Sequence, residues 1–126
     1  MDDFSRKHID EGVIITAHLT RATLKEAFEL KKLVEAELIY RHYKLVIDLS
    51  ECEFIDSTFL GTLVFAHKKY IGKQGRLNVI LHFRSNRDLF YVTNTLSVLN
   101  IYESLDEAVT GLNNYDNLPI VQVMAE

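Results

Sequence analysis

The stretch LVIDLSECEFIDSTFLGTLVF, residues 45–65, decides the fold. It opens inside a nearly continuous apolar run, residues 44–49, which is typical of a strand covered on both faces by helices. A short acidic connection follows, and a Ser-Thr pair then opens a second apolar run, predicted to be a helix from Ser57 to near Gly72. A buried strand that leads directly into a helix indicates an α/β sheet with its polar residues at a strand's carboxyl end.

Strand and helix patterns alternate outward from this stretch. Residues 12–19 are short and β-branched, residues 23–38 repeat apolar side chains at helical spacing, and residues 76–83 form the next predicted strand. The other predicted elements are a strand near 4–9, a short helix at 86–94, a brief strand at 100–104 and a last helix at 104–112. We therefore predict an α/β domain with a mixed, mostly parallel sheet of four to five strands and about four helices.

Several residues have the types that begin or end helices. Asn86 is predicted to cap the start of the short helix, and Asn94 to take a left-handed conformation at its end. Ser104, with Glu107 three residues later, predicts a capping box. At the central helix, either Asp56 or Ser57 can serve as the N-cap, which alone would explain both residue types.

Length and composition limit the functions to consider. The chain has 126 residues, one domain's length, and its 48% hydrophobic residues are enough to bury a core. A formal net charge of −4 with scattered basic residues favours neither nucleic acid nor an anionic membrane as a partner. We therefore expect a protein or a small ligand as the partner.

Cysteine content and the N-terminus predict the compartment. Cys52 is the single cysteine and has no internal disulfide partner, and MDDFSRKHID lacks the regions of a signal peptide. No apolar run approaches the roughly 18 residues that suggest a membrane span. The sequence thus predicts a cytoplasmic domain over residues 1–112, with residues 113–126 as a tail that forms either an edge strand or a partner-binding arm.

The motif resembles the signature of a known family. VIDLSECEFIDSTFLGTLV is similar to the signature of STAS domains of the anti-sigma-factor antagonist type, in which Asp-Ser-Ser/Thr-Gly-Leu-Gly follows a strand and opens a helix. Further on, RLNVILHF and VTNTLSVLNIYESLDEAV resemble the family's later strands and last helix. The resemblance covers about residues 12–112 in order.

The resemblance implies a switch that works by binding. It makes Ser57 the serine that an anti-sigma-factor kinase phosphorylates, with Thr58 as a minor acceptor and Asp56 as the acid before it. In the family, the unphosphorylated domain engages the kinase and frees a sigma factor, phosphorylation ends that engagement, and a serine phosphatase restores it. The resemblance implies no catalysis and no cofactor for the chain itself.

The sequence departs from the family at two places. Phe59 stands where the family usually has glycine, and HLTR, with Thr20 and Arg21, replaces an early Gly-Glu-Leu-Asp segment that contacts the kinase. We predict a partner surface made of Asp56, Ser57, Thr58, Phe59, Leu60, Thr20 and Arg21. If Phe59 and Leu60 are hydrophobic anchors, at least one of them should be largely exposed.

Other functions receive weaker support. Histidines 18, 42, 67 and 82 lie on different predicted elements without metal-type spacing, so we predict no metal site. Cys52 is expected to be a small inert thiol, and no glycine-rich phosphate loop is present, so an enzyme is not favoured. Three alternatives stay open: a STAS scaffold or transport-accessory module without phosphorylation control, an enzyme that uses Ser57 or Cys52, and a nucleotide-binding module.

Overall fold

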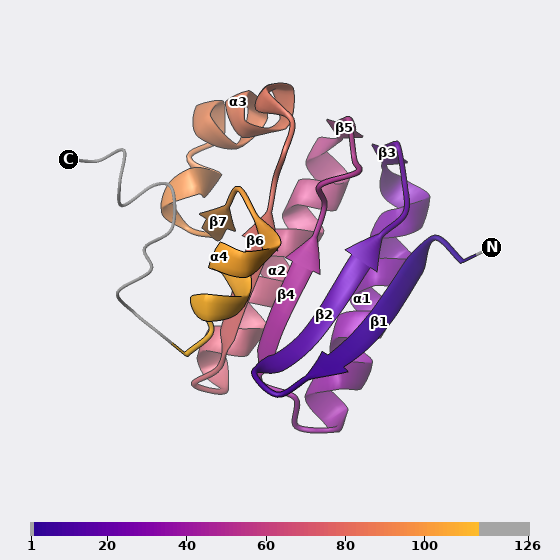
Figure 1. Ribbon diagram of the computed structural model, residues 1–126. Coiled ribbons are helices and arrows are strands. Elements are labelled where there is room, and N and C mark those ends of the chain that lie inside the picture. Colours follow the sequence, from indigo (N-terminus) through magenta and orange to yellow (C-terminus); the bar gives the residue numbers. More distant parts are fainter. Residues whose placement is uncertain (1, 114–126) are drawn as a thin grey trace.

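A computed structural model describes residues 2–113 of the chain. Seven strands and four α-helices alternate within these residues (Figure 1). In chain order the elements are β1 (Phe4–Ile9), β2 (Gly12–Ala17), β3 (Arg21–Ala22), α1 (Leu24–Ile39), β4 (Lys44–Asp48), β5 (Phe54–Ile55), α2 (Ser57–Gly72), β6 (Arg76–Ile80), α3 (Arg84–Val92), the 3-10 helix η1 (Thr95–Ser97), β7 (Asn100–Tyr102) and α4 (Leu105–Thr110). No helix in this part of the chain is long and apolar enough to cross a membrane.

Five of the strands form one sheet in the order β1-β2-β4-β6-β7. The β1–β2 pair is antiparallel, and the β2–β4, β4–β6 and β6–β7 pairs are parallel, because helical crossovers return the chain between them. The short strands β3 and β5 pair with each other in parallel, beyond the carboxyl ends of β2 and β4 (Figure 1). The predicted α/β fold with a mixed, mostly parallel sheet and four helices is confirmed.

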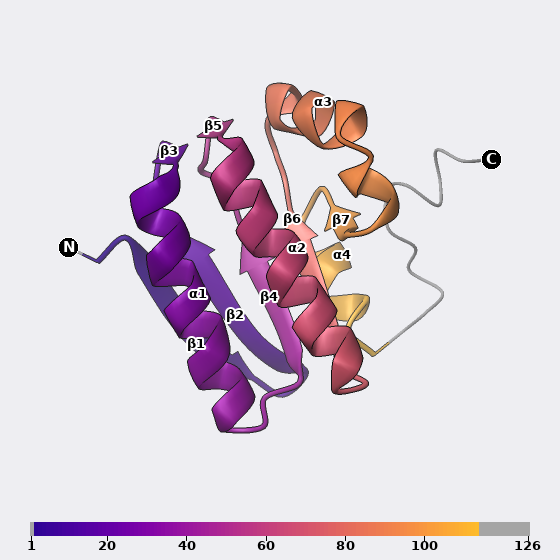
Figure 2. The ribbon, with the colours of Figure 1, turned by 180° about the vertical axis from the view of Figure 1, so that it is seen from behind.

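The sheet separates two layers of helices. Helices α1 and α2 cover one face and α4 covers the other, as the two opposite views show (Figures 1 and 2). The alternation of β4 follows this arrangement: Leu45 and Ile47 join the core under α1 and α2, whereas Val46 packs with Tyr102 and Ala108 under α4. This explains why the strand reads as one continuous apolar run.

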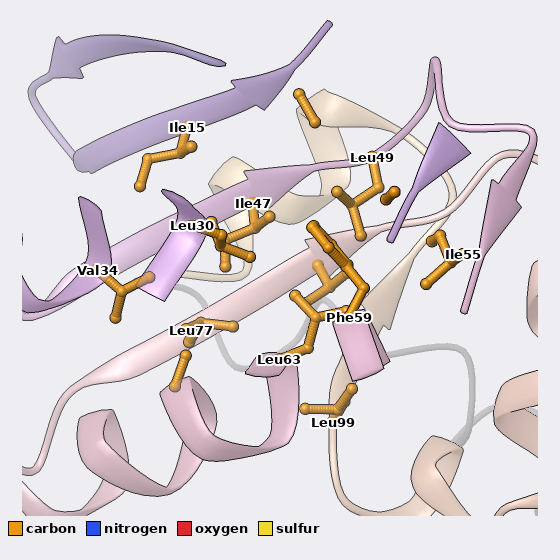
Figure 3. Close-up of a cluster of buried hydrophobic side chains, with 14 of the residues drawn as sticks. Ile15, Leu30, Val34, Ile47, Leu49, Ile55, Phe59, Leu63, Leu77 and Leu99 are labelled. Carbon is orange, nitrogen blue, oxygen red and sulfur yellow. The ribbon is translucent and has the colours of Figure 1, made fainter. Parts of the chain in front are cut away.

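The larger core lies between the sheet and the α1–α2 layer (Figure 3). Phe59 and Leu63 of α2 point into this core, and Leu30 of α1 belongs to the same cluster. All three side chains have no exposed surface. Burying side chains of this size stabilises the fold by about 1.5–3 kcal/mol each. The first turn of α2 is therefore anchored in the core of the domain.

Most of the predicted helix and strand ends are confirmed. Asn94 has φ of 63°, the left-handed conformation predicted after the short helix. Ser104 is the N-cap of α4, and its Oγ accepts a hydrogen bond from the Glu107 amide at 3.3 Å. The strand near the N-terminus is β1, which pairs along its whole length with β2.

One predicted cap is wrong. Helix α3 begins at Arg84 with Phe83 as its N-cap residue, so Asn86 lies inside the helix and does not cap it. Strand β6 correspondingly ends at Ile80, before the predicted residue 83. Asn86 is buried because its side-chain amide is engaged elsewhere, as described below. The predicted tail spans residues 113–126, and all of it from residue 114 onward lies outside the described residues, so its role stays a prediction.

Candidate functional site

The β3–β5 ladder brings the two halves of the predicted partner surface together. Arg21 is aligned with Phe54 across this ladder. The Thr20 carbonyl accepts hydrogen bonds from the amides of Glu53 at 2.8 Å and Phe54 at 3.1 Å. The Thr20–Arg21 segment, which is more than thirty residues from the Ser-Thr pair in the printed sequence, therefore lies beside the loop that leads into α2.

Asp56 caps helix α2 and leaves both hydroxyl side chains at the surface. Its Oδ1 accepts a hydrogen bond from the Phe59 amide at 2.8 Å, so the carboxylate satisfies one of the free amides at the helix start. Ser57 is the first helical residue, and both it and Thr58 are exposed. The cap thus uses Asp56 and leaves the Ser57 side chain exposed to solvent.

The prediction that Phe59 or Leu60 would be largely exposed is wrong. Phe59 has no exposed surface and Leu60 is only 4% exposed. The reason is helical periodicity: Phe59 and Leu63 lie one turn apart on the stripe of α2 that faces the sheet (Figure 3). Neither side chain can therefore serve as a hydrophobic anchor for a partner unless the core opens.

Phe54 is the exposed aromatic residue beside Ser57. Its side chain is 42% exposed, and the Arg21 guanidinium carbon lies 4.3 Å from its ring centroid. This cation–π contact holds an aromatic face and a positive charge together at the surface. The sequence pattern left open whether Phe54 was a core or a contact residue. In strand β5 Phe54 is exposed and the next residue, Ile55, is buried, so Phe54 is a surface residue.

Asn86 fixes the loop before the site, and the sequence reasoning missed this role. Its Nδ2 donates to the Cys52 carbonyl at 2.8 Å, and its Oδ1 accepts from the Ile55 amide at 3.2 Å. The side chain is only 3% exposed, so both backbone groups are satisfied inside the protein. The available sequence signal was an asparagine in the first turn of an amphipathic helix, on the same side as Phe90 one turn later.

Cys52 is part of this loop and is unsuited to nucleophilic chemistry. It is fully buried, and burial, with smaller contributions from Glu51 and Asp48, raises the pKa of the thiol to about 12. A thiol in that state is protonated at neutral pH, whereas the thiolate is the nucleophile. The arrangement agrees with the predicted inert role.

The surface around the site carries mixed charge. Glu51 and Glu53 are exposed on the loop, and Glu51 Oε2 lies 3.2 Å from His18 Nδ1. Arg21 contributes a positive charge from β3. The surface around the loop is therefore not uniformly negative, because the folded chain brings Arg21, which is distant in the sequence, beside it.

A groove of about 860 Å³ lies elsewhere, between β1 and α1. Its lining includes Phe4, Arg6, His18, Glu29 and Lys32, and none of residues 53–61. The Ser-Thr pair therefore lies on an open surface rather than in this groove. This geometry suits recognition by a protein better than enclosure of a small substrate.

Comparisons with known proteins agree with this architecture. A family model described as the STAS domain matches residues 13–108. An anti-sigma factor antagonist from Mycobacterium paratuberculosis is similar in structure, with a TM-score of 0.79, 23% identity, and coverage of 88% of this chain and 93% of that chain. The protein TM1081 from Thermotoga maritima gives a TM-score of 0.78 at 25% identity, covering 90% and 91% of the two chains.

More distant structures share the fold as well. The Bacillus cell fate determinant SpoIIAA, in its phosphorylated form, has a TM-score of 0.68 at 12% identity and covers 87% of this chain and 99% of that chain. At such identity the likeness shows the fold alone. No curated protein matches the chain closely in sequence.

Proposed function

Because the chain belongs to the STAS family, as the match over residues 13–108 shows, we propose that it is an anti-sigma-factor antagonist controlled by phosphorylation of Ser57. The observation that carries the proposal is the exposed Ser57 hydroxyl at the first position of α2, beside a cap that does not use it. In the unmodified state the domain binds an anti-sigma serine kinase in the cytoplasm. Phosphorylation by that kinase ends binding, and a serine phosphatase restores it.

The contact surface follows from exposure. It comprises Asp56, Ser57 and Thr58 on α2, with Thr20 and Arg21 on the neighbouring strand connection. Phe54 replaces Phe59 and Leu60 as the aromatic anchor, since it is the one of the three that is exposed. Aromatic and arginine side chains contribute most to binding energy in many interfaces, so the stacked Arg21–Phe54 pair is expected to be central.

A phosphate on Ser57 is compatible with the fold. The helix start provides free amide hydrogens and a favourable dipole for the roughly −1.5 to −2 charges of a phosphoserine. The exposed Glu51 and Glu53 nearby oppose that added charge only weakly, because solvent screens exposed groups. On association, however, the phosphate would lose its water, and burying an unpaired charge is costly. The switch therefore acts at the interface.

The chain itself is proposed to have no catalytic activity. Cys52 is buried with a raised pKa, and Ser57 stands on an open surface rather than in the described groove. Thr58 is the poorer acceptor in this proposal, because it lies one residue farther into the helix than Ser57. Neither Ser57 nor Cys52 is expected to catalyse turnover of ester or phosphate substrates.

Affinity purification from the native cell tests the proposal. Wild type, Ser57→Ala and Ser57→Asp are compared for bound proteins, and phosphate on the wild type is mapped by mass spectrometry. We expect a serine kinase with wild type and Ser57→Ala, its loss with Ser57→Asp, and phosphate at Ser57. Phosphate found only at other residues contradicts the switch.

A constitutive scaffold or transport-accessory module is the second candidate. It is favoured by Arg21, which gives the surface a positive charge where the resembled family has an acidic segment. In that case the same partner is retained by Ser57→Asp, and no phosphate is found on Ser57. The purification described above therefore separates the two candidates.

A further inference from the structure

Three metal-binding side chains gather at the end of the sheet opposite Ser57. They are His8 on β1, Glu37 near the end of α1, and His42 in the connection to β4. One nitrogen or oxygen from each lies within 4.8 Å of the other two. Imidazole nitrogens with a carboxylate oxygen are a donor set suited to zinc. We propose that these residues bind a divalent transition-metal ion such as Zn²⁺.

The backbone holds two of the three donors in place. Helix α1 ends in a Schellman motif, in which the His42 amide bonds the Glu37 carbonyl at 2.9 Å and the Arg41 amide bonds the Leu38 carbonyl at 3.0 Å. Arg41 supplies the left-handed residue of this motif, with φ of 62°. Because the motif fixes the positions of residues 37 and 42, their side chains are close before any ion arrives.

The contact between the Glu37 and His42 side chains is not required by the backbone motif, as the other long helix shows. Helix α2 ends in the same way, with the Gly75 amide bonded to the Tyr70 carbonyl at 2.8 Å and Gln74 at φ of 58°. An apolar contact commonly joins the two equivalent positions. In α1 they instead carry an imidazole and a carboxylate, with His42 Nδ1 2.5 Å from Glu37 Oε2.

Glu37 is oriented by a second partner. Its Oε1 accepts a hydrogen bond from Arg6 Nη1 at 2.8 Å, although the Glu37 side chain is only 1% exposed. This contact resembles the outer-shell bonds that orient metal-ligating carboxylates, and it turns Oε2 toward the imidazoles. Arg6 also offsets the carboxylate charge, so we expect moderate affinity rather than that of a closed structural zinc site.

His8 completes the cluster from the edge strand. Its ring lies 5.0 Å from the His42 ring, centroid to centroid, at an interplanar angle of 76°. His8 is exposed, so an ion can reach the cluster from solvent, and water can fill the remaining positions. The carboxyl end of α1, which has no basic residue in its last turn, also favours a cation nearby.

Binding requires only a small rearrangement. Two ligands of one tetrahedral zinc ion, each about 2.0–2.1 Å from the metal, lie roughly 3.3 Å apart. The 2.5 Å contact between His42 Nδ1 and Glu37 Oε2 must therefore open slightly if both atoms ligate the ion. A ligating imidazole nitrogen must be unprotonated, so when Nδ1 of His42 binds the ion, the ring carries its N–H on Nε2. The bound ion would join edge strand β1 to the end of α1.

The test is a Zn²⁺ titration of the full, untagged chain by calorimetry after treatment with a chelator. We expect one ion per chain, and at least tenfold weaker binding in His8→Gln and in His42→Gln. His18→Gln is the matched control, because His18 also pairs with a carboxylate, that of Glu51, but has no second imidazole in its cluster. The control should bind Zn²⁺ within twofold of wild type.

Co²⁺ substitution provides an independent readout, since its visible absorption reports coordination by the protein. The proposal is overturned if the wild type shows no stoichiometric binding, or if His18→Gln weakens binding as much as His8→Gln. His8 is exposed, so its variant should fold even if His42→Gln does not, which a melting curve without metal will show. Neither result depends on the proposed role of Ser57.

Discussion

On helix α2, one face packs against the sheet and the opposite face is open to solvent. Phe59 and Leu63 belong to the packed face, and both are fully buried. Ser57, Thr58 and Gly61 belong to the open face and are exposed. Both faces come from one sequence motif, so the same motif supplies side chains to the core and side chains to the solvent-exposed surface.

This difference shows which substitutions in the motif should affect stability and which should affect binding. Phe59, which stands where the resembled family has glycine, contributes to the core and not to the partner surface. In the proposed function, recognition is left to the polar side chains of the open face and to Phe54 on the adjoining strand.

The largest expected effect is on Phe59. Phe59→Ala should lower the free energy of unfolding by about 3–5 kcal/mol, because it empties a fully buried position. Phe54→Ala, the matched control, should cost less than about 1 kcal/mol since Phe54 is partly exposed, yet it should weaken partner binding. Urea unfolding and partner titration measure the two quantities. Equal stability losses in the two variants would contradict the separation between the buried core position and the exposed surface position.

The second effect concerns the loop that supports the open face. Asn86→Ala should lower the free energy of unfolding by about 1–3 kcal/mol, because it leaves the Cys52 carbonyl and the Ile55 amide buried without their partner. Hydrogen exchange at the Ile55 amide should also become faster. Asp88→Ala, at an exposed position of the same helix, is the control and should change little. Unaltered exchange at Ile55 would argue against this role of Asn86.

A smaller effect is expected at the cap. Asp56→Ala should cost about 1 kcal/mol, because the Phe59 amide loses its acceptor. Asp56→Asn should retain most of that stability, since its side-chain oxygen can still accept the bond. If the asparagine variant binds the partner less well while its melting temperature is kept, the Asp56 charge belongs to the interface. A large stability loss in Asp56→Asn would contradict the capping role.

The smallest effect is a pH dependence from the packed face. Burial, with a smaller contribution from Arg76, lowers the pKa of His67 below its usual 6.5. As the pH falls below about 6.5, the unfolded chain therefore binds this proton before the folded chain does, and stability decreases. His67→Gln should flatten the fall in unfolding free energy in that range, whereas exposed His82→Gln should not. Identical pH profiles for wild type and His67→Gln would show that His67 does not contribute.

The fold could be predicted because periodicity and burial follow directly from residue type. The continuous apolar run of β4 and the helical repeat of α1 each specify one kind of element. The Asp-Ser-Thr segment could likewise be placed at a helix start from capping preferences. These features depend on near neighbours in the chain, which the sequence displays.

What could not be predicted depends on contacts between distant segments. Whether Phe59 was core or surface depended on the rotation of α2 against the sheet. The inward turn of Asn86 and the approach of His8 to His42 depend on how separate elements pack. The histidines showed no metal-type spacing in sequence because β1 and the end of α1 meet only in the folded chain.

The most direct test of the Ser57 switch uses a chain with phosphoserine incorporated at position 57. Its affinity for the purified partner kinase and its melting temperature are compared with those of the unmodified chain. The proposal predicts at least a hundredfold loss of affinity, corresponding to about 2.7 kcal/mol, with a nearly unchanged melting temperature. Unchanged affinity with Ser57 fully modified would contradict the switch, and a collapsed melting temperature would contradict its action at the interface.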